Sequence, residues 1–283
     1  MSFIMTEQLF HQITTSGAAV NLSHRAKFQL TGTDRVRYLN GQVTNDVRRA
    51  TTTQALYACV TDAKGRIAGD VFIRATADSL LLDAEAESRE TLALRLERYI
   101  VADDVELADV TEAWQLWHVF GGAEAPADAV KSNRFGSEGF DLWLPADAAA
   151  PTFDETAVLS DEDAETWRIL HKIPRWPNEL NPETFPPEAG LMERAMDFSK
   201  GCYIGQEILS RIKTTGKMPR EMLAFETDGE VNSGDDIHAD KTVGKVTSTA
   251  LHPLTGIRIG LGMVRQGTTG SDLTAAGHSL RPR

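Results

Sequence analysis

Five prolines lie between residues 174 and 187, and this segment restricts the fold more than any other. They are Pro174, Pro177, Pro182, Pro186 and Pro187. Proline lacks a backbone N–H and has a fixed φ, so neither a helix nor a central strand can continue through them. We therefore expect a stiff, extended connection. It acts either as a linker between domains or as a support that positions the sequence after it.

That sequence contains the octet Lys-Gly-Cys-Tyr-Ile-Gly-Gln-Glu at residues 200–207. Apolar residues recur at helical spacing directly after it, so the octet predicts a tight loop that leads into a helix. Cys202 would then precede a helix N-terminus, where unpaired amides and the neighbouring Lys200 favour an anion. We expect its thiol to ionise more readily than that of a free cysteine. The alternative is a small buried cysteine among glycines that allow close packing.

Composition narrows the class of protein. A chain of 283 residues is long enough for two or three domains with full cores. The net charge of −12 argues against a surface that coats nucleic acid, although a local basic patch remains open. Two distant cysteines indicate a reducing compartment. Because no apolar run is long enough to cross a membrane and no signal peptide is recognisable, we expect a cytoplasmic protein.

Hydrophobic periodicity predicts a mixed α+β fold. We expect helices over residues 34–41, 88–100 and 161–170, and strands over 55–60, 67–74, 80–83, 103–107, 114–120 and 140–144. The segment 121–132 has the composition of a loop or a domain junction. From residue 222 onward, short strands alternate with glycine-rich turns, which predicts a small β-domain.

Two polar stretches are candidates for a site. The segment 41–47 lies between hydrophobic elements, so its amides and hydroxyls either face a pocket or form an ordinary turn. Asp70 falls inside the predicted strand 67–74. A strand aspartate is usually on the solvated face, and otherwise it needs a hydrogen-bonding partner.

Several common sites are missing from the sequence. It contains no phosphate-binding loop, no closely spaced pair of histidines or cysteines, and no Gly-x-Ser-x-Gly elbow. We therefore expect no built-in zinc or iron-sulfur site. A histidine partner for Cys202, such as His24 or His171, cannot be recognised from spacing.

The octet resembles the signature Lys-Gly-Cys-Tyr/Phe-x-Gly-Gln-Glu of the YgfZ family, folate-binding proteins related to the glycine-cleavage T-protein, an aminomethyltransferase. Further segments occur in the order of that family: 30–34, 41–47, 65–70, 168–174 and 185–188. The resemblance covers nearly the whole chain, with the last 60 or so residues similar only in pattern.

The resemblance implies an α+β, three-domain ring around a central channel for tetrahydrofolate or a derivative, with a small β-barrel-like domain at the C-terminus. The domains would span residues 1–112, 113–220 with the octet, and 221–283, and they can interleave. The resemblance also implies a role in assembling or repairing iron-sulfur clusters in enzymes such as radical enzymes that modify tRNA. The partners would be folate and iron-sulfur client or assembly proteins, with direct tRNA contact a weaker expectation.

The resemblance also implies which residues act. Cys202 would be the working thiol, with Lys200 beside it. The residues expected to bind folate are Asp70, Asn45, Gln42, Tyr57, Tyr203, Gln206, Glu207 and Arg211.

Three positions depart from the T-protein. The T-protein carries Asp where this chain has Cys202, and an acidic pair where this chain has Gly69-Asp70. Its Arg-x-Glu-Ala-Gly segment reads Arg168-Ile169-Leu170-His171-Lys172 here, and Leu170 cannot accept hydrogen bonds from a pterin. These departures favour the YgfZ branch and an accessory protein.

Two other functions remain open. One is a folate-dependent aminomethyltransferase or demethylase in which Asp70 acts at a folate nitrogen. The other is a binding module without chemistry, in which the cations between Arg211 and Arg220 dock a partner protein or tRNA.

Overall fold

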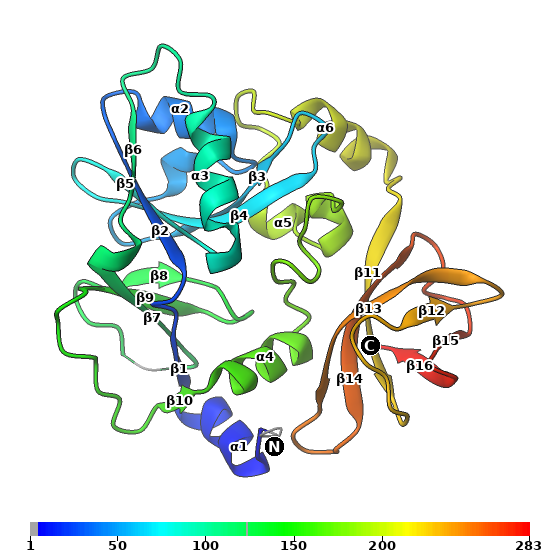
Figure 1. Cartoon of the computed structure of the whole chain (residues 1–283). Coiled ribbons are helices and arrows are strands. Elements are labelled where there is room, and N and C mark those ends of the chain that lie inside the picture. Colours follow the sequence, from blue (N-terminus) through cyan, green and yellow to red (C-terminus); the bar gives the residue numbers. More distant parts are fainter. Residues whose placement is uncertain (1–4, 123) are drawn as a thin grey trace.

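The computed structural model describes residues 5–122 and 124–283, which form two five-stranded sheets and a closed barrel. Figure 1 shows the sheets on one side of the molecule and the barrel on the other, with helix α4 and the proline-rich segment between them. The expected α+β fold with a C-terminal barrel is therefore confirmed. In the described residues no helix is both long and apolar enough to span a bilayer.

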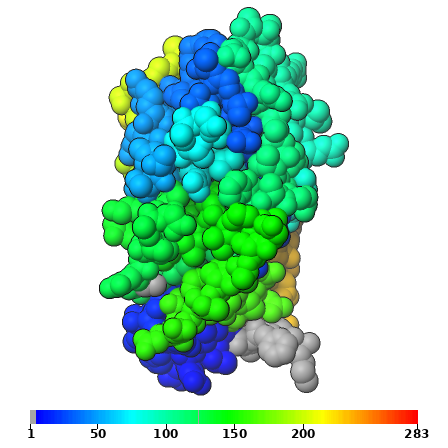
Figure 2. All heavy atoms as spheres, turned by 90° about the vertical axis from the view of Figure 1, so that its left-hand side faces the viewer, coloured from blue at the N-terminus to red at the C-terminus, as the bar shows by residue number. Residues whose placement is uncertain are grey.

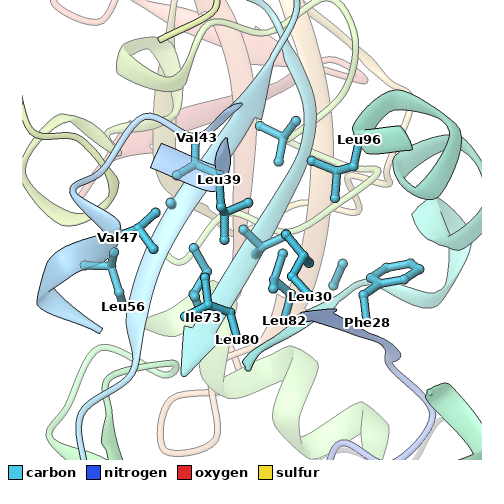
Figure 3. Packing of buried hydrophobic residues seen from close by; sticks show 14 of the residues in the cluster. Phe28, Leu30, Leu39, Val43, Val47, Leu56, Ile73, Leu80, Leu82 and Leu96 are labelled. Carbon is cyan, nitrogen blue, oxygen red and sulfur yellow. The ribbon is translucent and has the colours of Figure 1, made fainter. Parts of the chain in front are cut away.

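The first sheet, called sheet B, is antiparallel and has the strand order β3-β4-β5-β2-β6. Its strands are β2 (Ala26–Thr31), β3 (Leu56–Thr61), β4 (Ile67–Ala75), β5 (Leu80–Ala84) and β6 (Glu106–Asp109). Helices α2 (Arg35–Gln42) and α3 (Arg89–Glu97) contribute Leu39 and Leu96 to the core on one face of this sheet. Figure 3 shows these side chains among those of Phe28, Leu30 and Leu82.

The second sheet, called sheet A, has the order β10-β1-β7-β9-β8. Its strands are β1 (Ala18–Asn21), β7 (Trp114–Phe120), β8 (Val130–Ser132), β9 (Gly139–Pro145) and β10 (Ala157–Leu159). Only β1 and β10 pair in parallel. Helices α1 (Glu7–Ser16) and α4 (Asp161–Leu170) cover one face through Ile13 and Trp167. In the space-filling view of Figure 2, atoms around sheet B lie above the green atoms around sheet A.

Strand β1 precedes residue 112 but pairs with β7 and β10, which follow it, so sheet A crosses the expected boundary between the first two domains. The division at residues 112 and 220 itself stays a prediction. Strand β9 was expected from its alternating pattern, yet it is buried on both faces. The reason is that a second apolar cluster, which includes Phe140 and Leu142, covers the face away from α4.

The barrel closes in the order β11-β14-β13-β12-β15-β16. Its strands are β11 (Arg220–Thr227), β12 (Asp236–His238), β13 (Thr242–Leu251), β14 (Arg258–Arg265), β15 (Leu273–Ala275) and β16 (His278–Pro282). Arg168 on α4 donates to Ser248 on β13 at 2.6 Å, and Glu179 accepts from the same hydroxyl at 2.7 Å. These buried bonds join α4 and the proline-rich segment to the barrel.

The proline-rich segment contains only turns and one short 3₁₀ helix, η4 (Pro186–Ala189), as the prolines require. It leads to α5 (Met192–Ala195) and then to α6 (Gln206–Thr215), which begins with the last two residues of the octet. The remaining 3₁₀ turns are η1 (Val47–Arg49), η2 (Ala86–Ser88) and η3 (Thr111–Ala113). The helices predicted over 34–41 and after the octet are thus present as α2 and α6.

Candidate ligand-binding site

A cavity of about 350 Å³ lies where sheet B, the start of sheet A, α4, the proline-rich segment and α5 meet. Its walls carry aromatic side chains, including Tyr57 and Phe72, whose rings stack at 4.6 Å between centroids. Acidic and basic side chains line it as well. A concave space that combines aromatic and apolar side chains with convergent polar groups is a common form of small-molecule site.

Asp70 lies on the wall of this cavity. It belongs to β4, is only 7% exposed, and accepts a 3.0 Å hydrogen bond from the Tyr57 hydroxyl through Oδ2. Its other oxygen, Oδ1, has no protein partner among the described residues. Burial raises the pKa of Asp70 to about 6, while Arg25 acts in the opposite direction. The solvated placement that is usual for a strand aspartate is therefore wrong for Asp70, because α4 and the proline-rich segment close over this part of the sheet.

The floor of the cavity is a chain of buried ion pairs that joins the two sheets. Arg134, which follows β8, donates to both oxygens of Asp141 on β9 and to both oxygens of Asp83 on β5, at 2.6–2.9 Å. Asp83 also accepts from Arg25 at 2.6 Å, and Asp141 contacts His118 at 2.8 Å. Because each carboxylate here is shared by two partners, the arginines that line the cavity are held in fixed positions.

Arg194 on α5 differs from the other arginines of the cavity. Arg25, Arg134, Arg168 and Arg175 all pair with carboxylates. Arg194 forms no ion pair within the part of the chain that the structure describes. It donates to the carbonyl of Asn133 at 3.1 Å and lies 5.8 Å from the centre of the Tyr57 ring. Its guanidinium is thus the cation of this cavity that a ligand carboxylate can pair with.

Lys200 of the octet is buried and acts on the backbone. Its ammonium donates to the carbonyls of Asn40, Val43 and Asn45 at 2.6–2.8 Å, and so holds the 40–45 loop. Burial lowers its pKa to about 8, and three acceptor carbonyls favour the protonated form at neutral pH.

The other residues of the octet attach the loop of the octet to α2 and to the β3–β4 hairpin. The Ile204 carbonyl accepts from Thr61 at 2.5 Å, and the Ile204 amide donates to Gly41 at 3.1 Å. Gly205 has a φ of 88°, and a Cβ there would lie 2.6 Å from the Asp62 carbonyl oxygen. Only glycine satisfies both the left-handed conformation and this close approach.

Cys202 is exposed, and α6 begins four residues later, at Gln206. The alternative of a buried, packed cysteine therefore does not apply to Cys202. Activation of the thiol stays a prediction, because Lys200 directs its ammonium to the 40–45 loop. Of the two histidines considered as partners, His24 lines the cavity, and Cys202 does not.

Among the other predicted site residues, only Asp70 and Tyr57 line the cavity. Asn45 donates to the Tyr57 carbonyl at 2.9 Å and so lies behind the wall, and Gln42 accepts from Arg95 at 3.0 Å. Tyr203 is buried with its ring 5.0 Å from the Lys200 ammonium. On α6, Gln206 is the first residue, and Glu207 and Arg211 form an exposed ion pair at 3.7 Å. A folate role for these six residues stays a prediction.

Leu170 ends α4 and packs with Ile169 against Ala224 and Ile259 of the barrel. It does not line the cavity. The α4 carboxylates on the cavity wall are Asp161 and Glu165, and Glu165 pairs with Arg168 and with Arg175.

Sequence reasoning missed Arg25, Arg134 and Arg194. Arg134 and Arg194 lie in segments that resemble loops, and their partners are far away in the sequence. In the described residues, no three His, Cys, Asp or Glu side chains come together as a metal site.

A protein-family model described as the GCVT N-terminal domain matches residues 4–127. The solved structure of aminomethyltransferase T of the glycine cleavage system from Bartonella henselae superimposes with a TM-score of 0.78. It covers 94% of this chain and 84% of that one at 15% identity. The fold is therefore that of the glycine-cleavage T-protein.

Two curated relatives refine this class. An iron-sulfur cluster assembly factor IBA57 homolog, mitochondrial, from Phaeosphaeria nodorum is 29% identical over 77% of this chain, which spans 57% of that protein. The tRNA-modifying protein YgfZ from Escherichia fergusonii is also 29% identical, over 74% of this chain and 72% of its own length. The chain is thus similar to the IBA57 and YgfZ proteins as well as to aminomethyltransferases.

Proposed function

We propose that this chain is a folate-binding accessory protein that supports the assembly or repair of iron-sulfur clusters in client enzymes such as radical tRNA-modifying enzymes. The similarity to an iron-sulfur cluster assembly factor and to a tRNA-modifying protein supports this proposal. The observation that carries the folate part is the unpaired oxygen of buried Asp70 on the cavity wall. A cytoplasmic location and direct tRNA contact belong to the proposal.

The residues of the cavity fit a tetrahydrofolate. The Asp70 Oδ1 atom is a buried acceptor that needs an N–H donor, and a pterin ring carries several. Tyr57 and Phe72 provide aromatic surface beside it, and Arg194 offers a cation for a carboxylate of the ligand. When bound, tetrahydrofolate supplies a carrier for one-carbon units.

Cys202 would then act outside the folate cavity. Its thiol is exposed and lies on a loop that Lys200 fixes to residues 40–45 and that packs at Gly205 against the β3–β4 turn, so a partner protein can reach it while the loop stays in place. We propose that this surface meets the client or assembly protein.

Two experiments test the proposal. Calorimetry with tetrahydrofolate should show binding to the wild type that is weakened in Arg194→Gln and unchanged in the exposed control Arg37→Gln. No binding to the wild type would dismiss the folate assignment. In cells that depend on this gene, Cys202→Ala should lower the activity of a cluster-containing tRNA-modifying enzyme, whereas the buried control Cys59→Ala should retain it; full activity of Cys202→Ala contradicts the role of the thiol.

The alternative is a folate-dependent aminomethyltransferase or demethylase of the T-protein type. The pKa of Asp70 near 6 favours it, because such a carboxylate can accept and return a proton near neutral pH. An assay of one-carbon transfer to tetrahydrofolate separates the two functions. The accessory function predicts no transfer.

A further inference from the structure

The segment 43–45, which follows α2, lies behind the wall of the ligand cavity rather than in it. Among the residues that the structure describes, none between 40 and 45 and none of the octet lines the cavity. The segment belongs to no helix or sheet, and only Val43 makes an isolated bridge, to Val60 on β3. Its conformation therefore depends on hydrogen bonds to other parts of the chain.

On one side, Thr44 is bonded to the two elements that carry part of the cavity wall. Its hydroxyl accepts from the Cys59 amide of β3 at 2.9 Å and donates to the Ala195 carbonyl of α5 at 2.6 Å. Strand β3 carries Tyr57 and helix α5 carries Arg194, and both of these residues line the cavity. One hydroxyl thus holds β3 and α5 together directly behind the wall.

Asn45 makes a second connection to the same wall. Its side-chain amide donates to the backbone carbonyl of Tyr57 at 2.9 Å. The position of Tyr57, whose own hydroxyl bonds to Asp70, is therefore tied to the position of the segment 43–45.

On the other side, the carbonyls of residues 40–45 accept hydrogen bonds from the chain around the octet. The Lys200 ammonium donates to three of them, the Ile204 amide to a fourth and the Asp197 amide to a fifth. These carbonyls belong to Asn40, Val43, Asn45, Gly41 and Thr44, and the distances are 2.6–3.1 Å. The loop that carries Cys202 is thus attached to the segment that supports the cavity wall.

Burial makes these connections stiff. Thr44 is fully buried and Asn45 nearly so, and a buried polar group that loses its partner costs free energy. The wall, the segment 43–45 and the octet loop therefore keep their positions together. A ligand that orders Tyr57 and Arg194 also limits the motion of the octet loop, because both are held by the same segment.

We propose that Thr44 and Asn45 couple the ligand cavity to the octet loop. A ligand in the cavity stabilises the loop that carries Cys202, and a partner bound at that loop tightens ligand binding by the same factor. Both residues are positioning residues, because neither lines the cavity. This inference rests on the proposed folate function, and it adds regulation: the ligand prepares the surface that meets the client or assembly protein.

Hydrogen exchange measured by mass spectrometry tests the coupling. With saturating tetrahydrofolate, a fragment that covers residues 200–205 should exchange roughly 5-fold or more slowly in the wild type, the lower end of typical coupling between two sites. A fragment from barrel strand β14 is the internal control and should not change. Equal slowing in both fragments would show that the ligand only stabilises the whole chain, which excludes the coupling.

Thr44→Val keeps the shape of the side chain and removes both hydrogen bonds of the hydroxyl. It should abolish the effect of the ligand on the 200–205 fragment, at a tetrahydrofolate concentration that calorimetry shows to saturate the variant. Thr44→Ser keeps the hydroxyl and should retain the effect. An effect of the ligand that persists in Thr44→Val excludes Thr44 as the connection.

Lys200→Met tests the same connection from the octet side and does not depend on Thr44→Val being folded. It should weaken tetrahydrofolate binding roughly 5-fold or more, although Lys200 does not line the cavity. The exposed barrel control Lys241→Met should bind like the wild type. Unchanged affinity in Lys200→Met contradicts the coupling.

The outcomes separate the two claims. If the wild type does not bind tetrahydrofolate in calorimetry, the folate function itself fails, and this inference fails with it. If tetrahydrofolate binds and the exchange of the 200–205 fragment is unchanged, the folate function stands and the coupling is excluded. Slower exchange in this fragment that is absent from β14 and lost in Thr44→Val supports the coupling.

Discussion

The hydroxyl of Tyr57 donates a 3.0 Å hydrogen bond to Asp70 and leaves the second oxygen of that carboxylate on the cavity wall. Burial raises the pKa of Asp70 from 3.8 to about 6. Because the folded state holds this proton more tightly than the unfolded state, ionisation costs folded stability as the pH rises from about 4 to above 6. Above this pH range, the ionisation of Asp70 lowers the free energy of unfolding by ~3 kcal/mol.

Replacing Asp70 with Asn should therefore stabilise the ligand-free protein at neutral pH. We expect the free energy of unfolding to rise by ~1–3 kcal/mol at pH 7.5 and to change little at pH 4, where Asp70 is already protonated in the folded state. Urea unfolding at both pH values measures this, with the exposed Asp240→Asn as control. An equal effect at both pH values would show that ionisation of Asp70 is not the cause.

Folate binding should depend on the same titration. Ionised Asp70 accepts from a pterin N–H, so affinity should fall as the pH drops through about 6. Tyr57→Phe removes a donor that favours the ionised form, and the midpoint should move to higher pH. Calorimetry between pH 5 and 8 gives the midpoints, and Tyr99→Phe, which follows α3 and does not line the cavity, is the control. Identical midpoints in wild type and Tyr57→Phe would contradict the role of this hydrogen bond.

Lys200 should be needed for stability. Lys200→Met leaves the carbonyls of Asn40, Val43 and Asn45 without their donor, and we expect a loss of ~2–4 kcal/mol in the free energy of unfolding. The exposed Lys217→Met should have little effect. If both variants unfold at the same urea concentration as the wild type, the 40–45 loop does not depend on this ammonium.

Replacing Arg134 should lower the free energy of unfolding more than replacing an exposed arginine. Arg134→Met leaves the buried carboxylates of Asp83 and Asp141 with fewer partners. We therefore expect the free energy of unfolding to fall by ~3–5 kcal/mol. Arg37, whose ion pairs with Asp34 and Asp103 are formed by an exposed side chain, provides the matched control Arg37→Met, and unfolding should be nearly unchanged. A small loss in Arg134→Met would mean that water enters and solvates the two carboxylates.

The two thiols should differ in reactivity. Cys202 is exposed, while Cys59 is fully buried in β3 and its pKa is raised by burial. An alkylating reagent should modify one thiol in the folded protein and two after unfolding, as counted by mass spectrometry. In Cys202→Ala the folded protein should not react. The pH profile of the Cys202 reaction then tests activation of the thiol: a profile like that of free cysteine excludes it.

Local sequence signals predict the helices, strands and turns but not the segments that pack against them. The turn after residue 60, the helix α6 and the irregular proline-rich segment follow from residues close together in the chain. The burial of Asp70 does not follow from nearby residues, because the segments that cover Asp70 lie about a hundred residues later in the chain. The pattern of polar and apolar residues along one strand does not show whether another segment packs over that strand.

The same limit applies to the candidate site. Asp70 is a candidate because of its place inside a predicted strand and Tyr57 because of the resemblance, and the structure brings both to one cavity. Arg134 gave no signal, because its role depends on Asp83 and Asp141, which come from two different sheets. Lys200 and Cys202 were treated as one unit because they are neighbours in sequence, yet one is buried and the other is exposed.

The pairing of β1 with β10 has a consequence for how the chain is made. Ala18 pairs with Ala157, so strand β1 has no complete sheet to join until β10, far later in the sequence, has been synthesised. Its edges stay open during that time, and such edges are where nascent chains associate wrongly. Refolding of the full chain should therefore be slow relative to refolding of the barrel, whose strands all lie in the last third of the sequence.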